Sequence, residues 1–245
     1  MALVHELEKS GNWLFERRSW LPLVLIAAGI IVMYLTNRQA VIFDLREELI
    51  FFGVSLFGEA VRIFTVGHAP RNTSGRNTIS GQIADELNVT GIYSLLRHPL
   101  YMGNFFMWLG PVLFLRSILF VVFFILVYWL YYERIMFAEE QFLRRKFGDA
   151  YDKWSEAVNA IIPCFRGYIK PSLSFSYKNV LKREHNSFVN IFIIFSILDL
   201  FRNYFLSGRI YLTPFWIYLS IPAGILWVIV RIIHKKTKWL EEDGR

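Results

Sequence analysis

Long apolar stretches alternate with short polar segments along the 245-residue chain, and this pattern predicts a bundle of membrane-spanning helices. A helix needs about 20 predominantly apolar residues to cross the hydrocarbon core of a bilayer. We expect six spans, at residues 20–35, 49–66, 101–115, 117–137, 188–206 and 211–233. The expected fold class is therefore all-α, a polytopic membrane bundle of about six transmembrane helices.

The segments that connect these spans add detail to the predicted fold. The third and fourth spans meet at Arg116 with almost no connecting residues, which requires a tight helical hairpin. Residues 67–91 are polar and are expected to form a loop. The stretch 137–158 becomes amphipathic and charged, so the fourth helix is expected to continue beyond the membrane until Pro163 stops it.

The basic residues predict how the chain sits in the membrane. With six spans, the basic segments at residues 17–18, 67–98, 134–185 and 234–238 all fall on one side. Because cytoplasmic loops carry an excess of Lys and Arg, we expect both termini to be cytoplasmic. The first apolar run lacks a convincing small-residue cleavage site, so it is interpreted as an anchor rather than a removed signal peptide.

Composition supports a membrane protein and disfavours other classes. Hydrophobic residues make up 55% of the chain and aromatic residues 18%, more than soluble domains usually carry. The single cysteine, Cys164, excludes an internal disulfide framework, and no spacing of ligand residues supports a metal site. The net charge is +7, and the basic residues flank apolar spans, so anionic lipid is a better partner for them than nucleic acid.

The most informative polar residues stand where a basic loop meets the third span, in the stretch Arg97-His98-Pro99-Leu100-Tyr101-Met102-Gly103-Asn104. Pro99 suits the first turn of a helix, and the free N–H groups of such a turn attract anions. Arg97 can hold a carboxylate through two hydrogen bonds. Gly103 lets either a ligand or a second helix approach the backbone. A histidine at a helix start is more often a cap or a packed residue, but this context makes His98 a candidate for ligand binding.

Two acidic residues, Glu139 and Glu140, follow the fourth span. In isolation they indicate a solvated helix segment in which Glu140 and Arg144 form an ordinary i,i+4 ion pair. A hairpin of the third and fourth helices would instead bring the two acids close to Arg97 and His98. An acid in that position could bind a ribose diol or an amino group, or it could pair with Arg97.

A third cluster follows at residues 147–154, where an aromatic and charged helical pattern contains a glycine. Gly148 costs about 1 kcal/mol relative to alanine in a helix, so it marks a kink or a close approach. Tyr151 and Trp154 lie three residues apart and share a helix face. They are either interfacial anchors or an aromatic wall against a planar or cationic ligand.

Charged residues inside the predicted spans are few. Glu59 and Arg62 share one face of the second span, either as a shielded local ion pair or as a functional pair. Glu59 and Asp199 are the only acidic residues deep in the spans. A proton pump or transporter would carry such residues in several spans, so that class of function is not favoured.

Taken together, these elements resemble the isoprenylcysteine carboxyl methyltransferase family and its phospholipid methyltransferase relatives. The residues that carry the resemblance are Gly91-Ile92-Tyr93, Arg97 to Gly103, Glu139-Glu140, Leu143, Phe147-Gly148, Tyr151 and Pro163. They cover roughly residues 50–163, and no nucleophile elbow, P-loop or Rossmann glycine pattern competes with them. The resemblance implies an integral membrane enzyme that holds S-adenosylmethionine in a cytoplasm-facing pocket under the helical hairpin.

The resemblance also implies the candidate site. The candidate cofactor-binding residues are Tyr93, His98, Pro99, Tyr101, Gly103, Asn104, Glu139, Glu140 and Tyr151. The candidates to hold the acceptor, and hence the candidate catalytic residues, are Arg62, Arg76, Arg97 and Arg144. The chain divides accordingly into an N-terminal anchor helix and loop (1–48), a methyltransferase core (49–163), and a basic connector with a C-terminal helical hairpin (164–245).

The expected acceptor is an anionic group on a membrane lipid or a lipidated molecule. Members of the family that act on prenylcysteine tend to carry basic residues shortly after the Phe-Gly-x-x-Tyr element, whereas residues 154–162 contain none. The loop at residues 72–77 resembles the bacterial branch that methylates a lipid A phosphate. We therefore favour a lipid phosphate over a prenylcysteine carboxylate, and the bacterial inner membrane as the location.

Methyl transfer from a sulfonium needs an oxygen aligned with the methyl group and the exclusion of water. An acceptor that is already anionic needs no general base, which suits a site rich in arginine. Two alternatives stay open. One is an NADPH-dependent reductase of the sterol-reductase type, and the other is a non-enzymatic membrane protein in which Arg97 and Glu140 form a structural pair.

Overall fold

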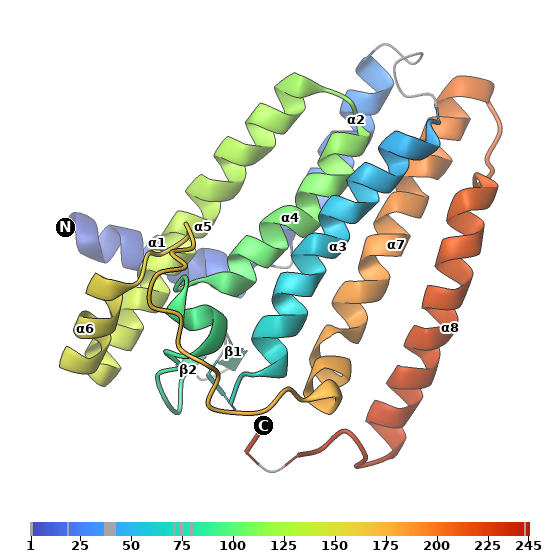
Figure 1. Ribbon diagram of the computed structural model, residues 1–245. Coiled ribbons are helices and arrows are strands. Elements are labelled where there is room, and N and C mark those ends of the chain that lie inside the picture. Colours follow the sequence, from blue (N-terminus) through green and yellow to red (C-terminus); the bar gives the residue numbers. More distant parts are fainter. Residues whose placement is uncertain are drawn as a thin grey trace.

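The chain folds into a bundle of helices (Figure 1). The computed structural model describes residues 2–18, 20–36, 43–70, 72–73, 76–78, 81–242 and 244–245, without the side chains of residues 20–22, 76–78, 81 and 82. The helices are α1 (Leu3–Glu16), α2 (Trp20–Leu35), α3 (Leu45–Gly67), α4 (Pro99–Phe114), α5 (Ile118–Phe147), α6 (Asp149–Ala157), α7 (Tyr177–Ser207) and α8 (Pro214–Lys236). One turn of 3₁₀ helix, η2 (Gly91–Ser94), precedes α4. The short strands β1 (Arg76–Thr78) and β2 (Gly81–Ile83) pair antiparallel beside it, and the rest confirms the all-α prediction.

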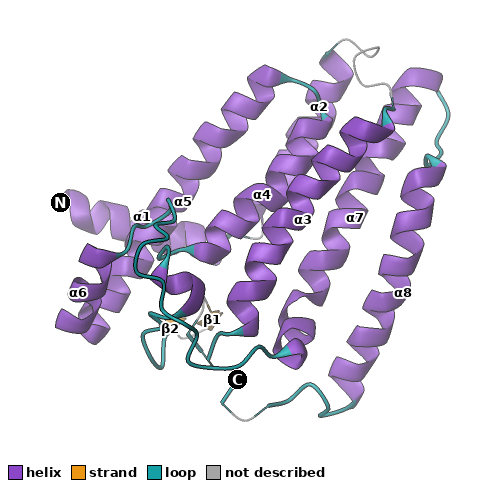
Figure 2. Ribbon diagram, in the orientation of Figure 1, coloured by secondary structure: helices purple, strands orange, loops and turns teal. Residues whose placement is uncertain are grey.

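The long helices α5, α4, α3, α7 and α8 follow one another across the bundle in Figure 1, and Figure 2 shows loops gathered at its two ends. Within the described chain, α3, α5, α7 and α8 are long and apolar enough to cross a membrane. Helices α2 and α4 have 16 residues each and are shorter than such a span requires by length alone. A polytopic membrane bundle is therefore confirmed, while the number of six spans stays a prediction.

Helices α3 and α4 pack closely because glycines face each other between them. A Cβ atom on Gly58 would lie 2.4 Å from the Gly103 carbonyl oxygen, and one on Gly103 would lie 2.6 Å from Cγ of Arg62. The Ser55 hydroxyl donates a hydrogen bond across the same contact to the Met107 carbonyl (2.9 Å). Small residues that let backbones approach are typical of helix contacts in membranes. The contact fixes the start of α4 against the end of α3.

Aromatic side chains join the C-terminal hairpin to the rest of the bundle. Phe195 of α7 stacks on Trp216 of α8 with ring centroids 4.8 Å apart, and both side chains are fully buried. Phe52 of α3 meets these two rings edge-on. Offset and edge-to-face pairs of this kind stabilise a core beyond the area that they bury.

A buried charge cluster ties the other end of the bundle together. Arg202 of α7 pairs with both Glu48 of α3 and Asp199, and all three side chains are at most 1% exposed. The Thr213 backbone N–H donates to Asp199 (2.6 Å), so the loop before α8 is held by the same cluster. Asp199, one of the two deep acidic residues of the sequence, is thus part of a structural charge network.

The predicted connections between the helices are partly correct. The tight α4–α5 hairpin is present, with Arg116 at φ 52° in its turn. The fourth helix does continue beyond its apolar span, to Phe147, but its predicted end at Pro163 is wrong, because Gly148 adopts φ 51° and ψ −128° and breaks the helix. A separate helix, α6, follows and ends at Ala157, after which Val158 is extended.

Two helical segments were not expected from the apolar pattern. Helix α1 packs on the second half of α5, where a Cβ on Gly11 would clash with the Arg134 carbonyl and the Tyr131 hydroxyl donates to the Leu14 carbonyl (2.9 Å). Helix α7 begins at Tyr177, well before the apolar span predicted from residue 188. Both segments are amphipathic rather than apolar, so a search for membrane spans passes over them.

The end of α3, the start of α4, the start of α7 and the C-terminus lie at the same end of the bundle (Figure 1). The C-terminal residue is anchored there, since Nη1 of Arg245 donates to the Gly67 carbonyl (3.0 Å). Helix α1 reaches the same end through its contact with α5. The orientation of this end toward the cytoplasm stays a prediction.

Candidate functional site

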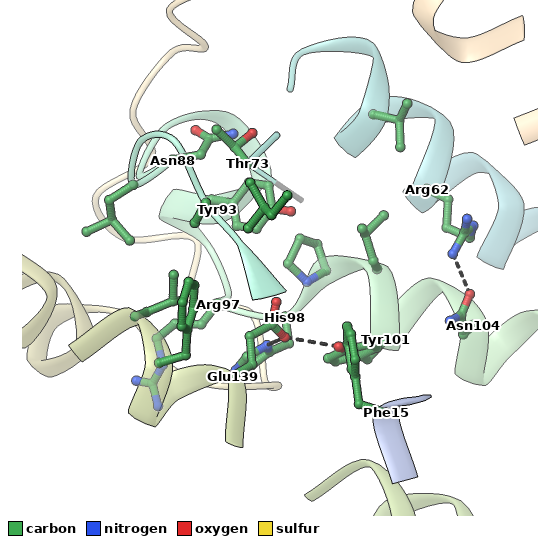
Figure 3. Close-up of a pocket in the computed structure, with 18 of the residues that line it drawn as sticks. Phe15, Arg62, Thr73, Asn88, Tyr93, Arg97, His98, Tyr101, Asn104 and Glu139 are labelled. Atoms are coloured by element: carbon green, nitrogen blue, oxygen red, sulfur yellow. Dashed lines mark hydrogen bonds and ion pairs between the residues drawn. The ribbon is translucent and has the colours of Figure 1, made fainter. Parts of the chain in front are cut away.

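A cavity of about 300 Å³ opens at this end of the bundle, between the start of α4, the second half of α5 and the first turns of α7 (Figure 3). Of the candidate residues named from the sequence, the following line it: Arg62, Tyr93, Arg97, His98, Pro99, Tyr101, Asn104 and Glu139. Residues from α1, α7 and the loop before η2 complete the wall. These lining groups come from segments far apart in the chain.

The start of α4 is held in place by the chain that follows α6. The Arg97 backbone N–H donates to the Asn159 carbonyl (2.8 Å), and the His98 N–H donates to the Ala160 carbonyl (3.1 Å). His98 is the residue before the helix, and Pro99 occupies its first turn. The His98 side chain does not cap the helix, and it lines the cavity.

His98 lies between the two acidic residues of α5. Its Nε2 is 2.9 Å from Oε1 of Glu140, and its Nδ1 is 3.6 Å from Oε2 of Glu139. Burial by itself disfavours a charged imidazole, but the hydrogen bonds and charges of the two carboxylates outweigh it and raise the pKa of His98. The charged imidazolium is therefore the stabilised form, held between two anions.

Arg97 uses its guanidinium to join three segments. Its Nε and Nη2 each lie 2.9 Å from Oε1 of Glu140, while Nη1 donates to the carbonyls of Ser155 (2.7 Å) and Val158 (2.6 Å). The Trp154 indole N–H donates to the Tyr93 carbonyl (3.1 Å) from the same side. These bonds fix α6 and the chain after it against the start of α4, and they account for the donors of Arg97.

Glu139 faces the cavity itself. The Tyr101 hydroxyl donates to its Oε2 (3.0 Å), and Figure 3 shows His98, Glu139 and Tyr101 converging on the cavity. The His98 and Tyr101 rings stack with centroids 5.6 Å apart. From behind, the Tyr128 hydroxyl donates to the Tyr101 carbonyl (2.7 Å), so α5 fixes this turn of α4 as well.

Arg62 forms another wall, and its partner differs from the one that the sequence suggested. It pairs with Glu184 of α7 through Nε (2.9 Å) and Nη2 (2.8 Å), and Nη1 donates to Asn104 (2.6 Å). The Arg62–Asn104 bond is drawn in Figure 3. The expected local pair with Glu59 is therefore replaced by a pair between two helices, because α7 brings a carboxylate into better reach.

Four candidates lie outside the lining of the cavity. Gly103 faces Gly58 and Arg62. Of the two partners that the sequence allowed for it, a ligand or a second helix, the structure shows the helix, α3. Glu140 lies behind His98 and Arg97. Tyr151 is buried beside Glu140, and this burial, with the Glu140 charge, raises the pKa of Tyr151. Arg144 pairs with Asp152 (2.8 Å) on the surface, and not with Glu140 as its spacing suggested. The side chain of Arg76, in β1, lies outside the described residues.

Several lining residues were not among the candidates predicted from the sequence. Glu184 and Arg183 come from the amphipathic start of α7, Phe15 and Arg18 come from α1 and the residues after it, and Asn88 comes from the loop before η2. Trp154 was singled out only as part of an aromatic pair. A helical pattern with one polar face could have predicted α1 and the start of α7 as helices. Nothing in the local sequence shows that these two helices reach the cavity.

Comparison with known proteins gives a consistent result for the core of the chain. Residues 49–150 match the profile of the phospholipid methyltransferase family. A probable protein-S-isoprenylcysteine O-methyltransferase of rice (Oryza sativa subsp. indica) is 33% identical over 109 residues, which is 44% of this chain and 56% of the rice protein. The protein-S-isoprenylcysteine O-methyltransferase of Schizosaccharomyces pombe is 40% identical over 81 residues, 32% of this chain and 34% of the yeast protein.

The matches are confined to part of each protein. The counterpart from Saccharomyces cerevisiae is 36% identical over 74 residues, 30% of this chain and 31% of that protein. The chain thus spans about half the length of the rice relative and about a third of the two yeast relatives. No solved structure matches the chain. The resemblance predicted from the motifs is confirmed for the segment that forms α3, α4 and α5.

Proposed function

We propose that this chain, whose residues 49–150 match the profile of the phospholipid methyltransferase family, is a membrane O-methyltransferase that uses S-adenosylmethionine. Its acceptor is an anionic oxygen on a membrane lipid or lipidated molecule. The observation that carries the proposal is the convergence of His98, Glu139 and Tyr101 on one cavity at the start of α4. His98, Glu139 and Tyr101 come from two helices, and they can contact the same ligand only if the fold brings them together.

The residues of the cavity suit the parts of S-adenosylmethionine. The start of α4, with Pro99 and Tyr101 on the cavity wall, suits the carboxylate of the methionine moiety because helix N-termini attract anions. The Glu139 carboxylate suits the ribose hydroxyls or the amino group. Trp154 and Phe142 offer aromatic faces to the adenine. The volume of about 300 Å³ is at the lower limit for small-molecule sites, so a snug fit is expected.

When bound, S-adenosylmethionine supplies a methyl group on a positively charged sulfur, which leaves as a neutral thioether when an oxygen takes the methyl. The chain's own task is to orient the two reactants and exclude water, because the donor is already activated. Glu140 and Arg97 act as positioning residues, since their bonds hold His98 and the segment after α6 in place. No residue needs to remove a proton from an anionic acceptor.

Cationic side chains on the α3 and α7 walls are the proposed acceptor site. Arg62 and Arg183 line the cavity from these two helices, which are both long and apolar enough to cross the membrane. A guanidinium binds phosphate or carboxylate oxygens through a planar pair of donors. Attraction that is too strong would stabilise the ground state, because the acceptor loses its charge as the bond forms. The Glu184 carboxylate on Arg62 moderates that attraction.

The preferred acceptor is a lipid phosphate, as expected from the absence of basic residues at positions 154–162. The names of the curated relatives favour a second candidate, the carboxylate of a prenylated cysteine. Both acceptors present an anionic oxygen next to an apolar chain. The guanidinium groups of Arg62 and Arg183 offer hydrogen-bond donors that suit either anion.

The test is methyl transfer by the purified chain in phospholipid vesicles. Methyl-labelled S-adenosylmethionine is supplied with either a lipid A extract or a farnesylcysteine analogue, and the label in the organic phase is counted. We expect label on the phosphate of the lipid A extract, and label on farnesylcysteine alone would reverse the preference. No transfer to either, together with no calorimetric binding of S-adenosylmethionine, would exclude the proposed activity.

A titration with NADPH separates the remaining alternative. A reductase of the sterol-reductase type would bind NADPH and not S-adenosylmethionine.

Arg183→Ala is the informative variant for the acceptor site, since it should raise the KM for the acceptor at least fivefold and leave the Kd for S-adenosylmethionine unchanged. Arg209→Ala, an exposed arginine in the loop after α7, is the matched control and should change neither constant.

A further inference from the structure

A second cavity, of about 180 Å³, lies between α3, α7 and α8, away from the start of α4. Its wall includes Glu59, Ile63, Glu184, Phe188, Leu226 and Val230. Most of these side chains are aliphatic or aromatic. Helices α7 and α8 lie beyond residues 49–150, so eight of the ten residues that line this cavity come from the part of the chain that the family profile does not match.

Glu59 is the exception in this apolar wall. Its side chain is 1% exposed, and neither carboxylate oxygen has a hydrogen-bond partner among the described residues. Burying a carboxyl group without a partner is costly, and ionisable residues inside membrane helices usually serve a ligand or an ion.

The charges around Glu59 favour a cation. The nearest cationic side chain, Arg62, is already bound to Glu184 through Nε and Nη2 and to Asn104 through Nη1. The local group therefore contains two carboxyl groups and one guanidinium. His185 does not supply the missing partner through Nδ1, because that atom bonds to the Leu181 carbonyl of its own helix (2.8 Å).

We propose that this cavity binds the ammonium group and adjoining hydrocarbon of an apolar amine, with Glu59 as its anionic partner. The aliphatic and aromatic wall takes the hydrocarbon, and the unpartnered carboxyl group takes the ammonium. Leu226 of the wall is 47% exposed on the outer surface of α8, so the hydrocarbon reaches the cavity from the side of the bundle that faces lipid. This site is separate from the proposed methyl-transfer cavity, although Glu184 lines both.

The experiment measures the melting temperature of the full chain in non-ionic detergent at pH 7.5 with octylamine, octanol or octanoate. These probes share one hydrocarbon chain and differ in the charge of the head group. We expect octylamine to raise the melting temperature in a saturable manner, octanol to raise it by less than half as much, and octanoate to leave it unchanged. Equal effects of octylamine and octanoate would overturn the proposal.

Two variants locate the effect. Glu59→Gln should abolish the octylamine shift, whereas the matched control Glu133→Gln, on an exposed face of α5, should retain it in full. Val230→Phe keeps Glu59 and fills the cavity, so it should also abolish the shift and serves if Glu59→Gln fails to fold. An undiminished shift in either Glu59→Gln or Val230→Phe would show that the amine binds elsewhere. None of these outcomes depends on methyl transfer.

Discussion

His98 and Glu140 are 42 residues apart in the sequence, yet Nε2 of His98 lies 2.9 Å from Oε1 of Glu140. This contact joins the start of α4 to the second half of α5 at the end of the bundle where the larger cavity opens (Figure 3). Arg97 reinforces it by bonding the same carboxylate oxygen. The proposed binding site for S-adenosylmethionine depends on this contact between α4 and α5.

Glu139→Gln should weaken binding of S-adenosylmethionine at least tenfold, which corresponds to about 1.4 kcal/mol. The amide keeps the size of the side chain but removes the charge that faces His98 and accepts from Tyr101. Isothermal titration calorimetry measures the change in Kd. Glu133→Gln on the exposed face of the same helix is the control, and equal affinities for the two variants would remove Glu139 from the donor site.

Arg97→Ala should lower the free energy of unfolding by about 1–3 kcal/mol, because it leaves Glu140 and two carbonyl oxygens without their charged donor. The side chains of Arg97 and Glu140 are 15% and 23% exposed, so solvent reduces the loss from that of a fully buried pair. Denaturant unfolding in mixed micelles measures it.

Arg144→Ala is the matched control for that variant. Its pair with Asp152 is exposed, and removing it should change the free energy of unfolding by less than about 0.5 kcal/mol. A loss for Arg144→Ala as large as that for Arg97→Ala would contradict the assignment of Arg97 as the bridge between α4, α5 and α6.

Gly58→Ala should destabilise the chain markedly, by about 2 kcal/mol or more, whereas Gly53→Ala should be neutral or stabilising. A Cβ on Gly58 would meet the backbone of Gly103 and Met107 at 2.4–2.5 Å, and one on Gly53 would meet nothing within 4 Å. Both glycines lie in α3, so intrinsic helix propensity cancels in the comparison. Thermal unfolding of the two variants in one detergent provides the measurement, and equal melting temperatures would disprove close packing of α3 on α4.

The stability of the fold should fall as pH rises above the ordinary pKa of histidine, about 6.5. The folded-state pKa of His98 is raised, so the folded chain binds more protons than the unfolded chain between 6.5 and the raised value. The contribution of His98 is therefore complete below pH 6.5 and is lost as pH passes through its folded-state pKa.

His98→Gln should flatten this pH dependence, and His5→Gln, an exposed residue in α1, should leave it in place. Melting temperatures recorded from pH 5.5 to pH 9 in the absence of any ligand decide the point, with the pH range chosen to bracket the ordinary histidine pKa. A slope of opposite sign, or the same slope in His98→Gln, would show that the carboxylates do not hold a charged His98.

The motif from Arg97 to Asn104 and the acidic pair at Glu139 and Glu140 could be recognised along the chain because each lies beside an apolar span. Hydrophobic length predicted the helices α3, α5 and α8, and the absence of linker residues predicted the α4–α5 hairpin. Those features are local, since apolar content and turn length depend only on neighbouring residues.

Only the tertiary structure decided which polar groups are partners. Spacing suggested Glu59 for Arg62 and Glu140 for Arg144, yet Arg62 pairs with Glu184 and Arg144 pairs with Asp152. Arg62 is largely buried and Arg144 is exposed, but each pairs with the carboxylate that the fold brings into the best geometry, wherever that carboxylate lies in the sequence. The sequence by itself therefore determined the membrane helices and the two motifs of the site. The packing of α7 against α3 gave Arg62 its partner and the break before α6 gave Arg144 its partner, while Glu59 has no hydrogen-bond partner among the described residues.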